Sequence, residues 1–271
     1  MIFPDANSRH TYFTLHNIRE AQALSKGKGC KVGILDHSFG MELHPKLYSG
    51  GRNFVSDDDE FLTKREWHGY WMAKTLREIA PEVEIYALNT YSFEDLNSTV
   101  EAISKAIDWA IQRQIDVLTY SHAAVTSEAR QLFNDALDRA HSSGIITTFI
   151  HTGHPGNIMP YGLFPGEDDG REPDIHILHY DYSVVMVDEY WKLKDGQASW
   201  WNPPFLSFSS TSPVLAGVVS MMKSLNPNLK SDQYRKLLRE TACPLEFEGR
   251  QVPRALDALA AVKQAKASFN L

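Results

Sequence analysis

The stretch K31-V-G-I-L-D36 decides the fold, because an uninterrupted apolar run ends there on a carboxylate. Similar runs recur along the chain, at Glu84–Leu88, Val117–Ser121, Ile145–Ile150, Ile175–Leu178 and Ser183–Val187. A half-buried strand alternates apolar and polar residues, whereas most of these runs are apolar almost throughout. Such runs are typical of strands covered on both faces, so we expect a mostly parallel sheet.

Helix-like stretches fill the intervals between these runs. We expect helices at Gly69–Ile79, Thr99–Arg113, Glu128–Ser142, Ser210–Leu225, Asp232–Thr241 and Ala255–Ala267. In the second of them Val100, Ile103 and Ile107 recur at three- and four-residue steps, which gives one apolar stripe that can cover a sheet. This alternation predicts a doubly wound α/β fold with helices on both faces. Functional groups of such folds lie at the carboxyl ends of strands, where Asp36 and Ser121 stand.

The composition is that of an ordinary globular protein. The chain has 271 residues, of which 43% are hydrophobic and 23% charged, and it can bury a large core without disulfide or metal staples. The net charge of −7 argues against a nucleic-acid partner. Neither a leader-like segment nor a membrane-length apolar run is visible, and Cys30 and Cys243 are the only cysteines. We therefore expect a cytoplasmic protein without membrane contact.

Two further segments carry chemistry that complements Asp36. The segment W67-H68-G69 places a histidine at a helix start, beside a glycine that permits close backbone approach. The segment S207-F-S-S-T-S-P213 places serines just ahead of a helix rich in small residues. A serine is a weak nucleophile unless a base accepts its proton, and a carboxylate can hold a histidine in the tautomer required. Asp36, His68 and one of these serines could therefore form a nucleophilic triad.

The chain resembles the subtilisin-like serine peptidases, the subtilases of peptidase family S8, in the order and spacing of several motifs. These motifs are G29-C-K-V-G-I-L-D36, H44-P-K-L47, H68-G-Y-W-M-A-K-T-L76, A80-P-E-V-E-I-Y-A-L88, A106-I-D-W-A-I-Q-R-Q-I-D-V-L-T-Y-S121, S207-F-S-S-T-S-P-V-L-A-G217 and N226-P-N228. The order Asp, His, Ser is the known order of subtilisin and is not deduced from these residues. The resemblance implies a single catalytic domain over residues 1–271, with an extension at 1–15 and a family-like core at 16–265.

The resemblance also implies an activity and assigns catalytic roles. It implies a serine endopeptidase that hydrolyses peptide bonds through an acyl-enzyme. Asp36 would orient His68, His68 would act as general base, and Ser209 would be the nucleophile. Pro213 and Gly217 set the register that selects Ser209 among the neighbouring serines.

Several positions depart from the family pattern. D36-H37-S38 stands where the family has Asp-Ser/Thr-Gly, and Tyr70-Trp71 stands where it has Thr-His. For the oxyanion hole, the backbone N–H of Ser209 is one expected donor, and a side-chain amide is normally the other. His154 falls at that second position and is the expected donor, with Asn157, three residues later, as the alternative.

The expected partner is a peptide or protein substrate. The segment S121-H-A-A-V125 could pair with an extended peptide as a strand edge, which makes Ser121, His122 and Ala123 candidate substrate-binding residues. The departures leave two alternatives open. The chain could be a pseudopeptidase that binds peptides without cutting them, or a transacylase that passes the acyl group to an amine, as subtilase-like peptide macrocyclases do.

No metal or other cofactor is expected. Two HxxH pairs occur, at His151/His154 and His176/His179, but residues three apart on a strand point to opposite faces. The acidic run D57-D-D-E60 could hold Ca²⁺, as in other family members, yet its spacing is not that of an EF-hand loop and a solvated loop is expected.

Overall fold

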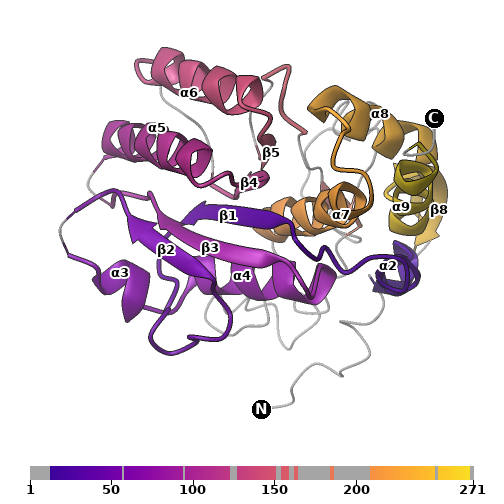
Figure 1. The fold of residues 1–271 in the computed structure, drawn as a ribbon, viewed down its shortest axis with the longest axis horizontal. Helices are drawn as coiled ribbons and strands as arrows, with labels where there is room; N and C mark the ends of the chain where they lie inside the picture. Colours follow the sequence, from indigo (N-terminus) through magenta and orange to yellow (C-terminus); the bar gives the residue numbers. More distant parts are fainter. Residues whose placement is uncertain are drawn as a thin grey trace.

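The sheet at the centre of the molecule has five parallel strands. The structure, a computed structural model, describes residues 13–56, 58–93, 95–122, 127–150, 154–158, 162–163, 184–185, 208–247 and 250–268. The strands are β1 Lys31–Asp36, β2 Gly50–Asn53, β3 Glu84–Asn89, β4 Val117–Tyr120 and β5 Ile146–Phe149. They lie in the order β2-β3-β1-β4-β5, so that β1 is central and pairs in parallel with β3 and β4. The predicted parallel sheet is confirmed (Figure 1).

Helices cover both faces of this sheet. On one face lie α5 Leu96–Gln112 and α6 Arg130–Ser142, and on the other α4 His68–Ile79 and α7 Thr211–Leu225 (Figure 1). Their bounds agree with the predicted helices to within three residues at each end. The doubly wound arrangement with helices on both faces is therefore confirmed.

The strand sequences explain why two cores form. In β1, Val32 and Ile34 belong to the core beneath α4 and α7, whereas Leu35 belongs to the core beneath α5 and α6. All three side chains are buried. A strand that feeds two cores has no solvent face, which is why its sequence shows no polar alternation.

The remaining elements surround this framework. They are α2 Ile18–Gln22, α3 Glu60–Thr63, α8 Ser231–Thr241, α9 Ala258–Ala267, the parallel pair β6 Gly162–Leu163 and β7 Val184–Val185, and the antiparallel pair β8 Cys243–Phe247 and β9 Arg250–Ala255. The sequence did not predict the strands β2, β6, β8 and β9 or the short helices α2 and α3. The strand expected at Ile175–Leu178 lies outside the described residues, and of the one at Ser183–Val187 only β7 is described.

Glycines allow α4 to pack closely on its neighbours. A Cβ atom at Gly217 of α7 would lie 2.5 Å from Cγ2 of Ile79 in α4. One at Gly69 would lie 2.5 Å from the carbonyl oxygen of His37, just beyond β1. Real side chains do not approach so closely, so these contacts require glycine. They bring the first turn of α4 against the carboxyl end of β1.

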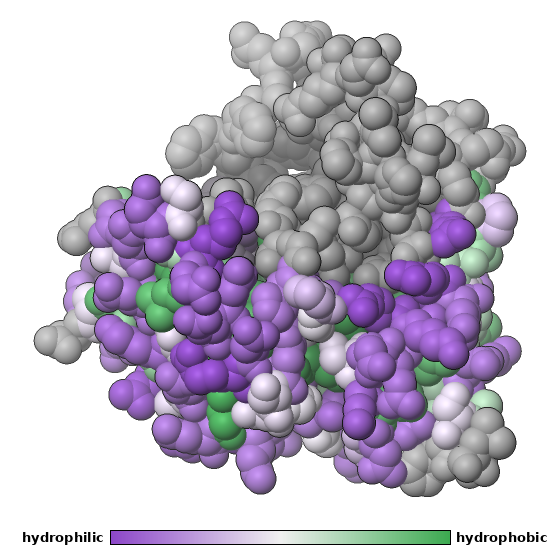
Figure 2. Space-filling model, turned by 90° about the horizontal axis from the view of Figure 1, so that it is seen from above, coloured by the Kyte–Doolittle hydropathy of each residue, from purple (hydrophilic) through white to green (hydrophobic). Residues whose placement is uncertain are grey.

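One face of the molecule is mostly polar where the structure describes it. On the face shown in Figure 2 the described residues are mostly hydrophilic, and the hydrophobic ones form small separate patches. This fits helices whose apolar stripes are turned toward the sheet.

Candidate active site

Asp36 is the centre of the site. It ends β1, its side chain is fully buried, and its carboxylate accepts hydrogen bonds from three N–H groups. The backbone N–H of His37 donates to Oδ1 at 2.8 Å, Nδ1 of His68 donates to Oδ2 at 2.7 Å, and Nε2 of His122 donates to Oδ1 at 2.9 Å. Burial by itself would raise the pKa of Asp36, but attraction and hydrogen bonds from His68 and His122 hold it well below its usual range. Asp36 is therefore an ionised acceptor between two imidazoles.

His68 is held by its backbone as well as by its ring. It is the first residue of α4, and the N–H groups on either side of it, of Trp67 and Gly69, donate to the carbonyls of Ser38 and His37 at 2.8 Å each. Burial lowers the pKa of His68, but the Asp36 carboxylate outweighs this effect and raises it above its usual value. Because Nδ1 carries the proton shared with Asp36, Nε2 is the basic nitrogen. Among the described residues, none is hydrogen-bonded to this Nε2.

Ser209 lies in a 3₁₀ turn, Phe208–Ser210, directly before α7. Its Oγ donates to the carbonyl of Ser121 at 3.2 Å, and Oγ of Ser121 donates back to the carbonyl of Ser209 at 2.9 Å. Within the described part of the chain, no hydrogen bond joins Ser209 to His68. The structure thus brings the serine to the end of β4 with its hydroxyl already occupied.

The first turn of α7 is anchored on the strand ends. Ser212 is fully buried, and its Oγ is bonded to Oγ1 of Thr119 at 2.6 Å and to the backbone carbonyl of Thr148. These contacts join α7 to β4 and β5 just below Ser209. The backbone position of the serine is therefore fixed even though its side chain can rotate.

His154 and Asn157, the two expected oxyanion donors, have other partners in this structure. Nε2 of His154 lies 3.3 Å from Oδ1 of Asp138 on α6, and its Nδ1 accepts from the N–H of Gly156 at 3.3 Å. The buried Asn157 amide pairs with the backbone of Phe149 through two bonds of 2.9 Å. Either side chain would have to leave these partners to reach an oxyanion, so the oxyanion role stays a prediction.

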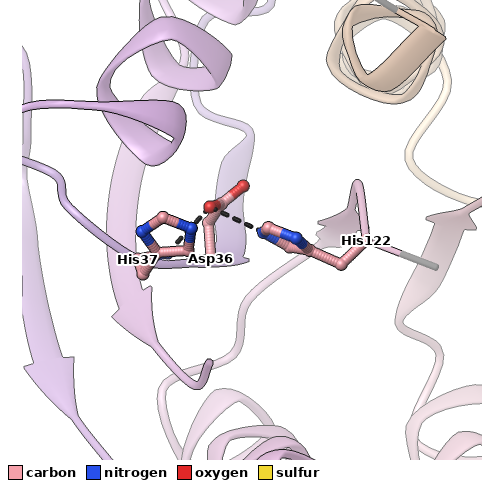
Figure 3. A group of neighbouring side chains, drawn as sticks. All are labelled: Asp36, His37 and His122. Atoms are coloured by element: carbon pink, nitrogen blue, oxygen red, sulfur yellow. Dashed lines mark hydrogen bonds and ion pairs between the residues drawn. The ribbon is translucent and has the colours of Figure 1, made fainter. Parts of the chain in front are cut away.

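Two histidines beside Asp36 were not expected there. His122 was a candidate for binding substrate, yet its ring points at Asp36 (Figure 3). His37 is buried, its ring lies 5.3 Å from that of His122 and 5.9 Å from that of His68, and burial lowers its pKa to about 4. Both residues follow the carboxyl ends of predicted strands, which marks them as candidates, but only the structure shows that the two strands are neighbours. Ala123 lies outside the described residues.

A cavity of about 460 Å³ opens beside these rings. His37 and His122 form part of its wall, and its aromatic lining comes from Phe61, Trp67, Tyr91 and Phe93. The site is thus a buried carboxylate, three imidazoles and a serine beyond the carboxyl ends of β1 and β4, and the cavity adjoins two of the imidazoles, His37 and His122. A serine-type hydrolase needs a serine nucleophile, an imidazole base and a carboxylate that orients the base, and all three kinds of side chain are present here.

Comparison with known proteins agrees with this chemistry. No family model matches the chain. Subtilisin DY from Bacillus licheniformis is 26% identical over 241 residues, which are 81% of this chain and 86% of the relative. The chain is a divergent subtilase. A thermostable alkaline protease from Halalkalibacterium halodurans is 22% identical over 244 residues, 80% of this subtilase and 63% of the relative.

Solved structures show the same fold at low identity. The serine protease MycP1 with its N-terminal propeptide removed superposes with a TM-score of 0.65 at 15% identity, covering 93% of this chain and 96% of that one. The prenylagaramide maturation protease PagA gives a TM-score of 0.64 at 16% identity, covering 92% and 98%. Together with the subtilisin relatives, these matches make this subtilase a serine-type endopeptidase.

The expected cytoplasmic location is wrong. One matched structure, with a TM-score of 0.57, is the periplasmic assembly from the ESX-5 inner membrane complex, and another is MycP1, an essential component of a type VII secretion system. This periplasmic and secretion-system setting belongs to those proteins, and it overturns the cytoplasmic expectation. The expectation rested on two cysteines and on the lack of a visible leader, and neither observation fixes the compartment. Among the described helices, none has the length and apolar character to cross a membrane.

Proposed function

We propose that this subtilase hydrolyses peptide bonds with Asp36, His68 and Ser209 as its triad. The observation that supports this most is the pair of hydrogen bonds from Nδ1 of His68 to the buried carboxylate of Asp36, at 2.7 and 2.9 Å. A carboxylate in this position fixes the tautomer in which Nε2 can accept a proton, and it stabilises the imidazolium that forms.

The reaction begins when the hydroxyl of Ser209 turns from the carbonyl of Ser121 toward Nε2 of His68. His68 takes the hydroxyl proton as Oγ bonds to the substrate carbonyl carbon, and it then gives that proton to the leaving amine as the C–N bond breaks. Water repeats the sequence on the acyl-enzyme and frees the acid. These steps draw on the chain's own side chains and water, without a cofactor.

The developing negative charge needs hydrogen-bond donors. We assign the backbone N–H of Ser209 as the first donor and a ring N–H of His154 as the second, with Asn157 as the alternative. The loss of one such donor costs on the order of 3 kcal/mol, or about a hundredfold in rate. An extended peptide substrate is proposed to pair with the backbone just beyond β4, at Ser121 and His122, with Ala123 as a further predicted contact.

A fluorophosphonate probe tests the nucleophile directly. We expect the wild type to gain one phosphonyl group on Ser209, located by peptide mapping, and Ser209→Ala to gain none. Ser210→Ala, one position along the chain, is the matched control and should still be labelled. An unlabelled wild type, or a label on Ser210, would refute the assignment.

A pseudopeptidase is the second candidate function. The bond from Ser209 to the Ser121 carbonyl and the other partners of His154 and Asn157 favour it. A wild type that binds a peptide but neither reacts with the probe nor cleaves would support it. If cleavage does occur, product mass separates hydrolysis, which adds one water, from transfer to an amine, which does not.

A further inference from the structure

We propose that Asp36, His37 and His122 form a binding site for Zn²⁺ or a similar transition-metal ion, and that an ion bound there weakens the interaction of Asp36 with His68. The metal site stands on the geometry of these three side chains. Its effect on catalysis rests in addition on the proposed triad.

The three side chains converge from two strand ends. Asp36 and His37 come from the end of β1, and His122 follows β4, the neighbouring strand (Figure 3). One ligand atom from each lies within 4.8 Å of the others. Tetrahedral zinc with bonds of 2.0 to 2.2 Å needs ligand atoms about 3.4 Å apart. Oδ1 of Asp36 and Nε2 of His122 are 2.9 Å apart and the His37 ligand atom lies within 4.8 Å of both, so the side chains must readjust to reach this spacing when an ion binds.

The donor set selects the kind of ion. Two imidazole nitrogens and one carboxylate oxygen suit zinc and its neighbours, whereas Ca²⁺ and Mg²⁺ prefer oxygen ligands alone. The carboxylate is fully buried, so a cation would compensate a charge that has no access to bulk water. In addition, Nδ1 of His37 is bonded to Oγ of Ser38 at 2.8 Å, an outer contact of the type that orients imidazole ligands.

The site has an entry path. His37 and His122 both line the cavity of about 460 Å³, so an ion can reach them from that side. Three protein ligands leave a fourth tetrahedral position for a water molecule in the cavity. Ligand identity, ligand number, an outer contact and an entry path are thus in place, and binding must adjust the distances between the ligand atoms.

Occupation would act on the triad through a shared atom. Oδ1 of Asp36 accepts from both His68, at 2.9 Å, and His122, at 2.9 Å. A metal ion would displace the proton on Nε2 of His122 and bind Oδ1 itself. The carboxylate would then attract the His68 imidazolium less strongly, and Ser209 would react more slowly. Zinc would therefore be a reversible inhibitor.

Cobalt titration of the metal-stripped protein tests the site. Co²⁺ bound by imidazole and carboxylate absorbs visible light, so we expect a saturable band at one equivalent that Zn²⁺ abolishes. His37→Gln and His122→Gln should each weaken Co²⁺ binding by more than about 100-fold, since even outer-sphere changes cost 10- to 100-fold. His44→Gln is the matched control, because His44 also pairs with a carboxylate, Glu66 at 2.7 Å, and should bind Co²⁺ as the wild type does.

A second measurement uses the wild type alone and covers the case in which a variant fails to fold. Zn²⁺ should protect His37 and His122, but not His44, from carbethoxylation, as read by mass spectrometry. The absence of a saturable band, wild-type affinity in both variants, or equal modification with and without Zn²⁺ would each overturn the site. Zinc should also slow fluorophosphonate labelling of Ser209. Cobalt binding without any labelling would instead contradict the triad and leave the metal site standing.

Discussion

The two halves of the site differ in how completely they are assembled. At Asp36 and His68 the carboxylate is buried, the histidine is bonded to it, and the backbone on both sides of His68 is anchored. At Ser209 the hydroxyl is bonded to a carbonyl, and the candidate donors His154 and Asn157 have other partners. The acid–base half is therefore preorganised, while the nucleophile half must rearrange when substrate binds. Catalytic hydrogen bonds often tighten only in the substrate complex.

The largest expected effect comes from the assembled half. Asp36→Asn should lower kcat by on the order of 10⁴, because an amide no longer holds His68 in the productive tautomer. The measurement is kcat on a chromogenic peptide, with far-ultraviolet circular dichroism to show that the variant folds. A folded Asp36→Asn variant that keeps more than about a tenth of the wild-type kcat would show that catalysis does not depend on the Asp36–His68 pair.

The unassembled half should respond differently at its two polar residues. His154→Ala should lower kcat by about 10² to 10³ with little change in the melting temperature, if its ring becomes the second donor. Asn157→Ala should instead cost about 1 to 3 kcal/mol of unfolding free energy, because it leaves the N–H and carbonyl of Phe149 unpaired. Kinetics and thermal melts on the same two proteins separate these outcomes. The reverse pattern would make Asn157 the donor.

The contact between α4 and α7 links the two halves. Gly217→Ala should cost about 1 to 3 kcal/mol of unfolding free energy, since the new Cβ would lie 2.5 Å from Cγ2 of Ile79. Ile79→Ala removes Cγ2, the atom nearest to the new Cβ, so the double variant should lose less than the sum of the two single variants. Denaturant melts of the four proteins measure this coupling. Strict additivity would contradict the close approach of the two helices.

The pH dependence of kcat/KM reports on the protonation of His68. Its pKa is raised above 6.5 by Asp36, so in the presence of EDTA kcat/KM should rise with pH through an apparent pKa above 6.5. His68 and Asp36 also make the free energy of unfolding depend on pH, and they do so in opposite directions. The raised His68 pKa stabilises the fold below pH 6.5, and this is lost as pH rises through the folded value. The lowered Asp36 pKa stabilises the fold above 3.8, and this is lost as pH falls through the folded value. A profile with its midpoint below 6.5 would contradict the ionised pair.

The smallest effect is expected at Ser38. It stands where the family has glycine and adopts a left-handed backbone, with φ of 58°. Ser38→Gly should remove strain of about 1 kcal/mol but also the bond from Oγ to His37, so the net change in unfolding free energy should stay within about 1 kcal/mol of zero. A large loss of stability, read from denaturant melts, would show that the hydroxyl matters more than the backbone.

The central strands and the core helices could be predicted from the sequence, because buried elements show a recognisable pattern of apolar residues. β1 and the core helices show it, whereas β2, with the sequence G50-G-R-N53, has no apolar run to detect. Asp36 and His68 could be placed together because the segments around them resemble the two segments that carry Asp and His in the subtilases. The position of His122 on Asp36 depends on how β4 lies beside β1, which a pattern within one strand does not encode. The partners of His154 and Asn157 depend on a loop conformation, and residue spacing does not fix that.

The most direct test of the triad is the trapping of an acyl-enzyme. The protein would be mixed with an activated ester in the presence of EDTA and quenched in acid. The products would be analysed by intact-protein mass spectrometry and by peptide mapping. We predict one acyl group on Ser209, none in Ser209→Ala, and much slower formation in His68→Ala. No adduct on the folded wild type, or an adduct on a different residue, would contradict the assignment of Asp36, His68 and Ser209.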